Sequence, residues 1–117
     1  MTDPRPVFDR EVFERHVGGD RALAQEILRM FLEDCPGRMA AIKAAVEQGD
    51  ANALCTAAHT LKGSVGYLAA AYVVDAAALL ERLGREGRLA DAPAVADQLE
   101  RAVARLVLEI QRAAIAS

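Results

Sequence analysis

One short segment of the sequence combines residue types that could accept a phosphoryl group. The segment AAHTLKGSVGYLAAA places a potential acceptor, His59, close to four further residues that could serve such a site: Lys62, Gly63, Ser64 and Gly66. Imidazole is a competent nucleophile at neutral pH, and a nearby ammonium could partly neutralise the charge of a phosphoryl group bound to it. No carboxylate or second histidine lies within one helical turn of His59 in the sequence. We therefore expect a site that suits an anion.

The helical periodicity of this segment predicts that His59 faces away from the core. With the apolar stripe taken as zero and about 100° per residue, His59 lies near 140° and Lys62 near 80°. Gly63 and Gly66 come out near 180° and 120° on the same count. A glycine inside a helix costs roughly 0.5–1 kcal/mol relative to alanine, so two of them beside an exposed histidine are a departure expected at functional sites. We interpret both glycines as space for an approaching partner.

Two helices are predicted before this segment. Asp9 can cap a short first helix, and Asp20 can cap a long second helix whose apolar stripe ends near Gly49. Pro36 interrupts that stripe, but the periodicity continues through it, which favours one kinked helix over a break.

Three further helices complete the predicted fold. The third begins after Asp50 and carries its stripe to Leu68, the fourth stops between Gly84 and Gly87, and the fifth begins near Asp91. Four long amphipathic helices with short connections indicate an all-α fold, an antiparallel four-helix bundle with a short additional N-terminal helix. We expect residues 1–117 to form a single domain, with residues 1–7 flexible.

Composition and charge exclude several functional classes. The 117 residues carry a net charge of −3 with basic side chains scattered among acidic ones, so we expect no nucleic-acid partner. Asp75 interrupts the longest apolar run and the N-terminus lacks an apolar signal core, so we expect a cytoplasmic protein without a membrane span. Cys35 and Cys55 have no metal-ligand spacing, and we expect free thiols and no metal site.

The segment AHTLKGSVGYLAA resembles the signature of histidine-containing phosphotransfer (HPt) domains. That signature runs histidine, any residue, Leu-Lys-Gly-Ser, a short spacer, then a leucine followed by small residues. The upstream stretch from ERHVGGD to DANAL is similar to the usual lead-in of the family, so the likeness covers nearly the whole chain. One departure is Ala69, where the family commonly has glycine, and we expect it to affect the helix junction rather than the chemistry.

The resemblance implies a function and a set of partners. His59 would be the phosphorylated residue, Lys62 and Ser64 would flank the phosphoryl group, and Gly63 would give a partner access. The protein would relay a phosphoryl group between aspartates of response-regulator receiver domains, downstream of a hybrid sensor histidine kinase. It would be a monomeric carrier and not an enzyme, with no cofactor of its own, since the receiver would supply Mg²⁺ and the catalysis.

Two alternatives remain open from the sequence. The phosphoacceptor and dimerisation part of a sensor histidine kinase usually has an acidic residue after its histidine and soon a proline, whereas Thr60 follows here and the next proline is Pro93. A cofactor-binding bundle would use His59 as a ligand, but such ligands project into the core. His16, near the end of the first helix, is assigned no function.

Overall fold

All regular structure in the described part of the protein is helical. The computed structural model describes residues 4–116, and it contains no strand in that range. In chain order the elements are α1 (Arg10–His16), α2 (Arg21–Gln48), α3 (Ala51–Val65), the 3-10 turn η1 (Gly66–Leu68), α4 (Ala71–Glu86), the 3-10 turn η2 (Leu89–Asp91) and α5 (Ala92–Ala116).

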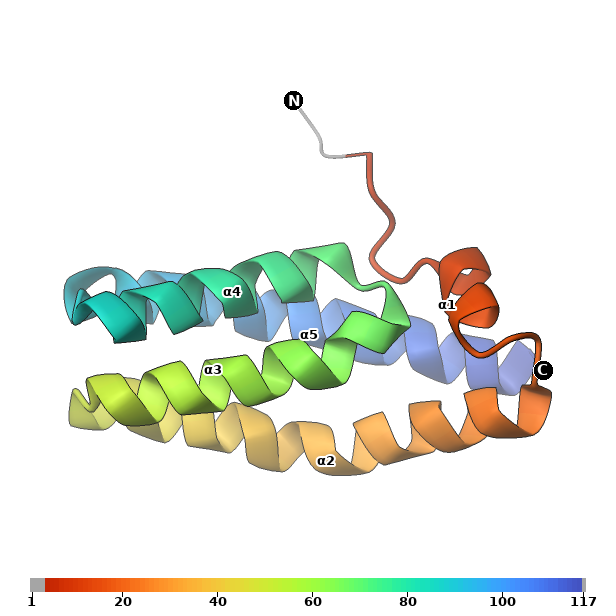
Figure 1. The fold of residues 1–117 in the computed structure, drawn as a ribbon, viewed down its shortest axis with the longest axis horizontal. Helices are drawn as coiled ribbons and strands as arrows, with labels where there is room; N and C mark the ends of the chain where they lie inside the picture. Colours follow the sequence, from red (N-terminus) through yellow and green to blue (C-terminus); the bar gives the residue numbers. More distant parts are fainter. Residues whose placement is uncertain (1–3, 117) are drawn as a thin grey trace.

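The four long helices form an antiparallel bundle in which each helix packs against its two neighbours. The chain runs up and down the bundle in the order α2, α3, α4, α5, and α5 returns beside α2 (Figure 1). Leucine, isoleucine and valine side chains from all four helices fill the centre, among them Leu54, Leu61, Leu80 and Leu99 with no exposed surface. The predicted four-helix bundle with an extra N-terminal helix is confirmed.

Local sequence signals explain where the helices begin. The carboxylates of Asp9, Asp20 and Asp50 each accept a hydrogen bond from the backbone N–H three residues later, at 3.0–3.2 Å. Each bond satisfies one of the amides that the first helical turn leaves without a partner. The helix α2 continues through the exposed Pro36 as one element, as the periodicity predicted.

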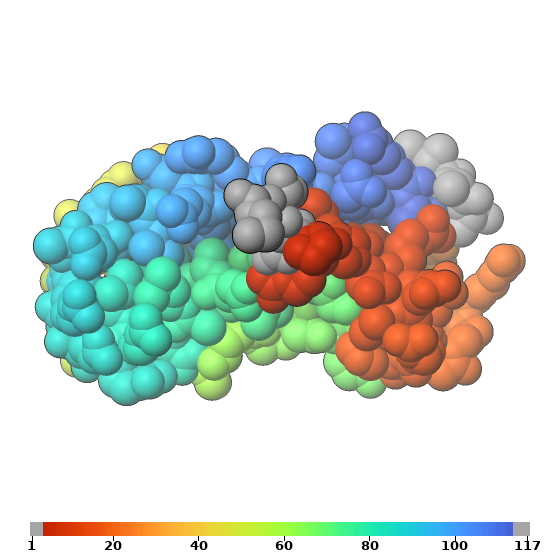
Figure 2. All heavy atoms as spheres, turned by 90° about the horizontal axis from the view of Figure 1, so that it is seen from above, coloured from red at the N-terminus to blue at the C-terminus, as the bar shows by residue number. Residues whose placement is uncertain are grey.

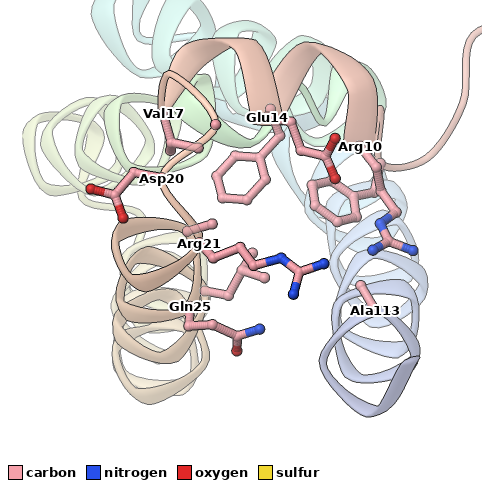
Figure 3. Close-up of a pocket in the computed structure, with 12 residues that line it drawn as sticks. Arg10, Glu14, Val17, Asp20, Arg21, Gln25 and Ala113 are labelled. Carbon is pink, nitrogen blue, oxygen red and sulfur yellow. The ribbon is translucent and has the colours of Figure 1, made fainter. Parts of the chain in front are cut away.

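The helix α1 closes one end of the bundle. Because α2 and α5 have 28 and 25 residues and α3 and α4 only 15 and 16, the longer pair extends beyond the shorter pair at this end. Phe13 and Val17 of the α1 region are buried there. A cavity of about 240 Å³ remains beneath α1, with Arg10 and Arg21 on its wall (Figure 3). His59 does not line this cavity.

The segment before α1 lies against the outside of the bundle. In Figure 2 this red segment covers part of the start of α4 and borders α5. The guanidinium of Arg5 forms an ion pair with Asp75 on α4 at 2.7 Å. Flexibility of residues 1–7 stays a prediction, and residues 1–3 lie outside the described part of the chain.

The turn between α3 and α4 differs from the sequence expectation. Gly66 was expected inside the helix, but α3 ends at Val65 and Gly66 begins η1, because the chain must reverse direction within a few residues. Ala69 follows in the left-handed region with φ of 55°, alone among the described non-glycine residues. The prediction that its departure from glycine concerns the helix junction agrees with this position.

Two contacts hold α1 on that turn. The backbone N–H of Asp9 donates to the carbonyl of Ala69 at 3.2 Å, and His16 Nδ1 lies 3.0 Å from the carbonyl oxygen of Tyr67. His16 therefore has a structural contact in this fold. Within residues 4–116, none of the helices has a stretch that is both long and apolar enough to cross a bilayer.

Candidate functional site

His59 lies on the solvent-facing side of α3. Its side chain keeps 67% of its surface exposed, whereas Ala58 and Leu61 on either side of it are fully buried. The prediction that His59 faces away from the core is confirmed. A cofactor ligand that projects into the bundle is therefore not what this histidine provides.

A carboxylate from the neighbouring helix meets the histidine. Glu81 of α4 places Oε2 at 3.1 Å from His59 Nδ1, and its Oε1 lies 2.6 Å from Lys62 Nζ. Arg85, one turn further along α4, donates to Oε2 at 3.0 Å. The Glu81 side chain is 10% exposed, so the three contacts form at the edge of the core and not in bulk water.

The contact with Glu81 decides which histidine nitrogen is free. An ionised carboxylate can only accept hydrogen bonds, so Nδ1 must carry the hydrogen that it shares with Glu81. In the neutral ring, the lone pair then belongs to Nε2. The arrangement leaves Nε2, and not Nδ1, available to act as a nucleophile.

The charges around Glu81 keep it ionised. Its contact with the Lys62 ammonium lowers the pKa of the Glu81 carboxyl, the hydrogen bond to His59 lowers it further, and burial acts in the opposite direction. Lys62 and Arg85 together carry two positive charges against the single charge of Glu81. The cluster can therefore still attract an anion.

The two glycines of the motif leave open space near the histidine. A Cβ atom added at Gly63 or at Gly66 would have no heavy atom of a neighbouring element within 4 Å, and both residues are exposed. The hydroxyl of Ser64 donates to the carbonyl of Leu61 at 2.9 Å. A place for Ser64 beside a phosphoryl group stays a prediction.

Glu81 and Arg85 are the site residues that the sequence analysis missed. No carboxylate lies within one helical turn of His59 in the sequence, but α4 brings Glu81 to the histidine from 22 positions away in the chain. A signal for Glu81 existed in the sequence. It lies four residues after Ala77 and next to Leu80, so an acid occupies the apolar stripe of its helix.

Neither cysteine takes part in the site. Cys35 is buried and Cys55 half-buried, both are free, and burial raises the pKa of the Cys35 thiol. In the part of the chain that the structure describes, no three or more of His, Cys, Asp and Glu gather in a way that could hold a metal ion.

Comparison with known proteins shows the family of this chain. The family model named Hpt domain matches residues 26–109. This chain belongs to the Hpt domain family. Hpt domains are phosphocarriers that take part in histidine phosphotransfer in two-component signalling.

A solved Hpt protein has the same fold. The crystal structure of histidine-containing phosphotransfer protein B (HptB) from Pseudomonas aeruginosa PAO1 is similar, with a TM-score of 0.85 and 29% sequence identity. The similarity covers 92% of this chain and 93% of that one. None of the curated proteins matches this chain significantly.

Proposed function

We propose that this Hpt domain carries a phosphoryl group on Nε2 of His59, between aspartates of response-regulator receiver domains. The observation that supports this most directly is the exposed imidazole whose Nδ1 is engaged by Glu81 at 3.1 Å. A ring held at one nitrogen and open at the other is oriented for attack without losing access to a partner.

The transfer step balances without a proton donor. The Nε2 lone pair attacks the phosphorus of an aspartyl phosphate, the N–P bond forms, and the P–O bond breaks to release the aspartate carboxylate. Nδ1 keeps its hydrogen, so the phosphorylated ring gains a positive charge. Glu81, at hydrogen-bond distance from Nδ1, stabilises that charge as it develops. Return of the phosphoryl group to a second aspartate is the reverse of the same step.

The cations of the site act on the phosphoryl oxygens in this proposal. The Lys62 ammonium has three donors and its contact with Glu81 occupies one of them, so others remain for an incoming phosphoryl group. Ser64 would approach the same group, since a hydroxyl that donates to a carbonyl can still accept or re-orient. Both residues neutralise or position charge and neither forms the bond.

The partner would supply the remaining chemistry. The described residues offer no cluster of carboxylates for a divalent cation, so the proposal places Mg²⁺ and catalysis on the receiver domain. Phosphate would enter the relay from a hybrid sensor histidine kinase. One chain already closes a four-helix bundle, which supports a monomeric carrier over the dimerisation fragment of a kinase.

The experiment compares the two histidines of the chain. Purified wild-type protein, His59→Gln and His16→Gln are each incubated with a receiver domain that carries a labelled phosphoryl group on its aspartate. Wild type and His16→Gln should acquire acid-labile phosphate, and His59→Gln should acquire none. The melting temperature of His59→Gln should stay close to that of wild type, because an exposed ring contributes little packing. Label on His59→Gln would refute the assignment.

A further inference from the structure

Gly84 is a buried glycine near the C-terminal end of α4, where α4 packs against the first turn of α3. A Cβ atom built at this position would lie 2.7 Å from the backbone nitrogen of Cys55 and 2.8 Å from the backbone oxygen of Ala51. Both neighbours are main-chain atoms of α3, so no side-chain rotation could relieve the overlap. The two helix backbones approach each other at Gly84 because no side chain separates them.

This glycine differs from the other helical glycines of the protein. A Cβ atom added at Gly37 of α2 or at Gly63 of α3 would have no heavy atom within 4 Å. All three positions cost helix stability in the same way relative to alanine. Of these three glycines, only Gly84 lies so close to a neighbouring helix that a side chain would not fit.

The close approach lies one turn away from the histidine cluster on both helices. Cys55 precedes His59 by one turn of α3, and Glu81 precedes Gly84 by one turn of α4. Because the helices are antiparallel, His59 and Glu81 lie on the same side of this close approach, so a change of helix spacing at Gly84 would also change the gap that the Glu81 side chain must span. At its far end Glu81 meets His59 at 3.1 Å, which is already near the long end of the usual 2.7–3.2 Å range.

We propose that Gly84 is a positioning residue, which lets α4 approach α3 closely enough for Glu81 to hold His59 and Lys62. An added methyl group would have to move from 2.7 Å to at least 3.4 Å from Cys55 to reach ordinary van der Waals contact. A displacement of that size carried along α4 would take Glu81 out of hydrogen-bond range of Nδ1. The consequence for transfer rests on the proposed role of His59, but the contact itself does not.

The first experiment measures which nitrogen of His59 carries the hydrogen. Wild-type protein and Gly84→Ala, both with ¹⁵N-labelled histidine, are compared by long-range ¹H–¹⁵N correlation above the titration range of the ring. Wild type should show mainly the Nδ1–H form. Gly84→Ala should show a several-fold increase in the Nε2–H form, and the pKa of the Glu81 carboxyl should rise toward its ordinary value as Lys62 moves away from it.

Gly37→Ala is the matched control. It makes the same chemical change in a helix where the added methyl group meets nothing, so the hydrogen should stay on Nδ1. If Gly84 had only a packing role, its variant would melt at a lower temperature while the folded protein kept the Nδ1–H form. That result would overturn the proposal.

A second variant decides the matter if Gly84→Ala does not fold. Glu81→Asp leaves the helix spacing unchanged but shortens the side chain by one methylene, so it should produce the same increase in the Nε2–H form. A Glu81→Asp protein that keeps the Nδ1–H form would show that the spacing is not limiting, and would overturn the proposal. These measurements need no phosphate, so their failure is distinguishable from a failure of His59 to accept a phosphoryl group.

Discussion

A glycine lies at each of the two faces of α3, and these two glycines have opposite surroundings. On the exposed face, Gly63 follows the histidine by one turn and has open space where a side chain would lie. On the buried face, α3 receives Gly84 of α4 so closely that a methyl group would collide with the backbone. Gly63 leaves space for a partner molecule, whereas Gly84 lets two helices pack closely within the protein. A glycine in a helix therefore has no single meaning until its neighbours are known.

The largest effect that would test this comparison is expected from Gly63→Gln. A long side chain one turn from His59 should hold the receiver away, and a displacement of about 1 Å of reacting atoms can cost about 100-fold in rate. Helix stability should rise at the same time by up to ~1 kcal/mol, because glutamine is the better helix former. Rapid-quench transfer assays and thermal melts measure the two effects. Gly63→Ala, with its smaller side chain, should slow transfer less. Transfer at the wild-type rate in Gly63→Gln would show that Gly63 does not provide access for the receiver.

A matched pair of alanine substitutions tests the two glycines by stability alone. Gly84→Ala should destabilise the protein by about 1–3 kcal/mol, the usual cost of inserting a group into a packed interior. Gly63→Ala should stabilise it by roughly 0.5–1 kcal/mol, since the added methyl group meets only solvent. Urea denaturation of both variants and wild type gives the free energies of unfolding. Changes of the same sign would break the comparison.

A smaller effect is expected at the junction of α3 and α4. Ala69→Gly should stabilise the protein by about 0.5–1 kcal/mol, because relief of a left-handed alanine, worth ~1–2 kcal/mol, exceeds the entropy that glycine adds to the unfolded chain. The rate of phosphotransfer should not change. Ala70→Gly, whose backbone has φ of −102°, is the control and should lose stability. A destabilised Ala69→Gly would mean that the turn does not strain its alanine.

The smallest effect is expected from Glu81→Gln and depends on pH. The folded state lowers the pKa of this carboxyl, so its contribution to stability is fully present above the unfolded value of about 4.3 and is lost as the pH falls through the folded value. The gap in melting temperature between wild type and Glu81→Gln should therefore be constant near neutrality and close in acid. Glu100→Gln, at an exposed position of α5, serves as the control. A gap that stays open in acid would show that Glu81 contributes by packing and not by charge.

Sequence reasoning predicted the features that depend on neighbours along the chain. Asp9, Asp20 and Asp50 each cap a helix by accepting a hydrogen bond from the backbone N–H three residues later. The starts of the helices therefore follow from local hydrogen bonding. The outward position of His59 follows from the helical period of the apolar residues around it. In both cases the interacting groups are separated by no more than a turn or two, and the helical repeat alone relates them.

Only the tertiary structure decided which groups meet across the bundle. Glu81 reaches His59 from another helix, and that contact depends on how α4 is rotated and how near it lies, which no spacing within either helix specifies. The different surroundings of Gly63 and Gly84 have the same origin. Gly66 lies outside α3 for a similar reason. The chain reverses direction toward α4, and this reversal ends α3 at Val65 although the helical pattern of the sequence continues. Distances between helices arise from packing of the whole core, so they exist only once the chain has folded.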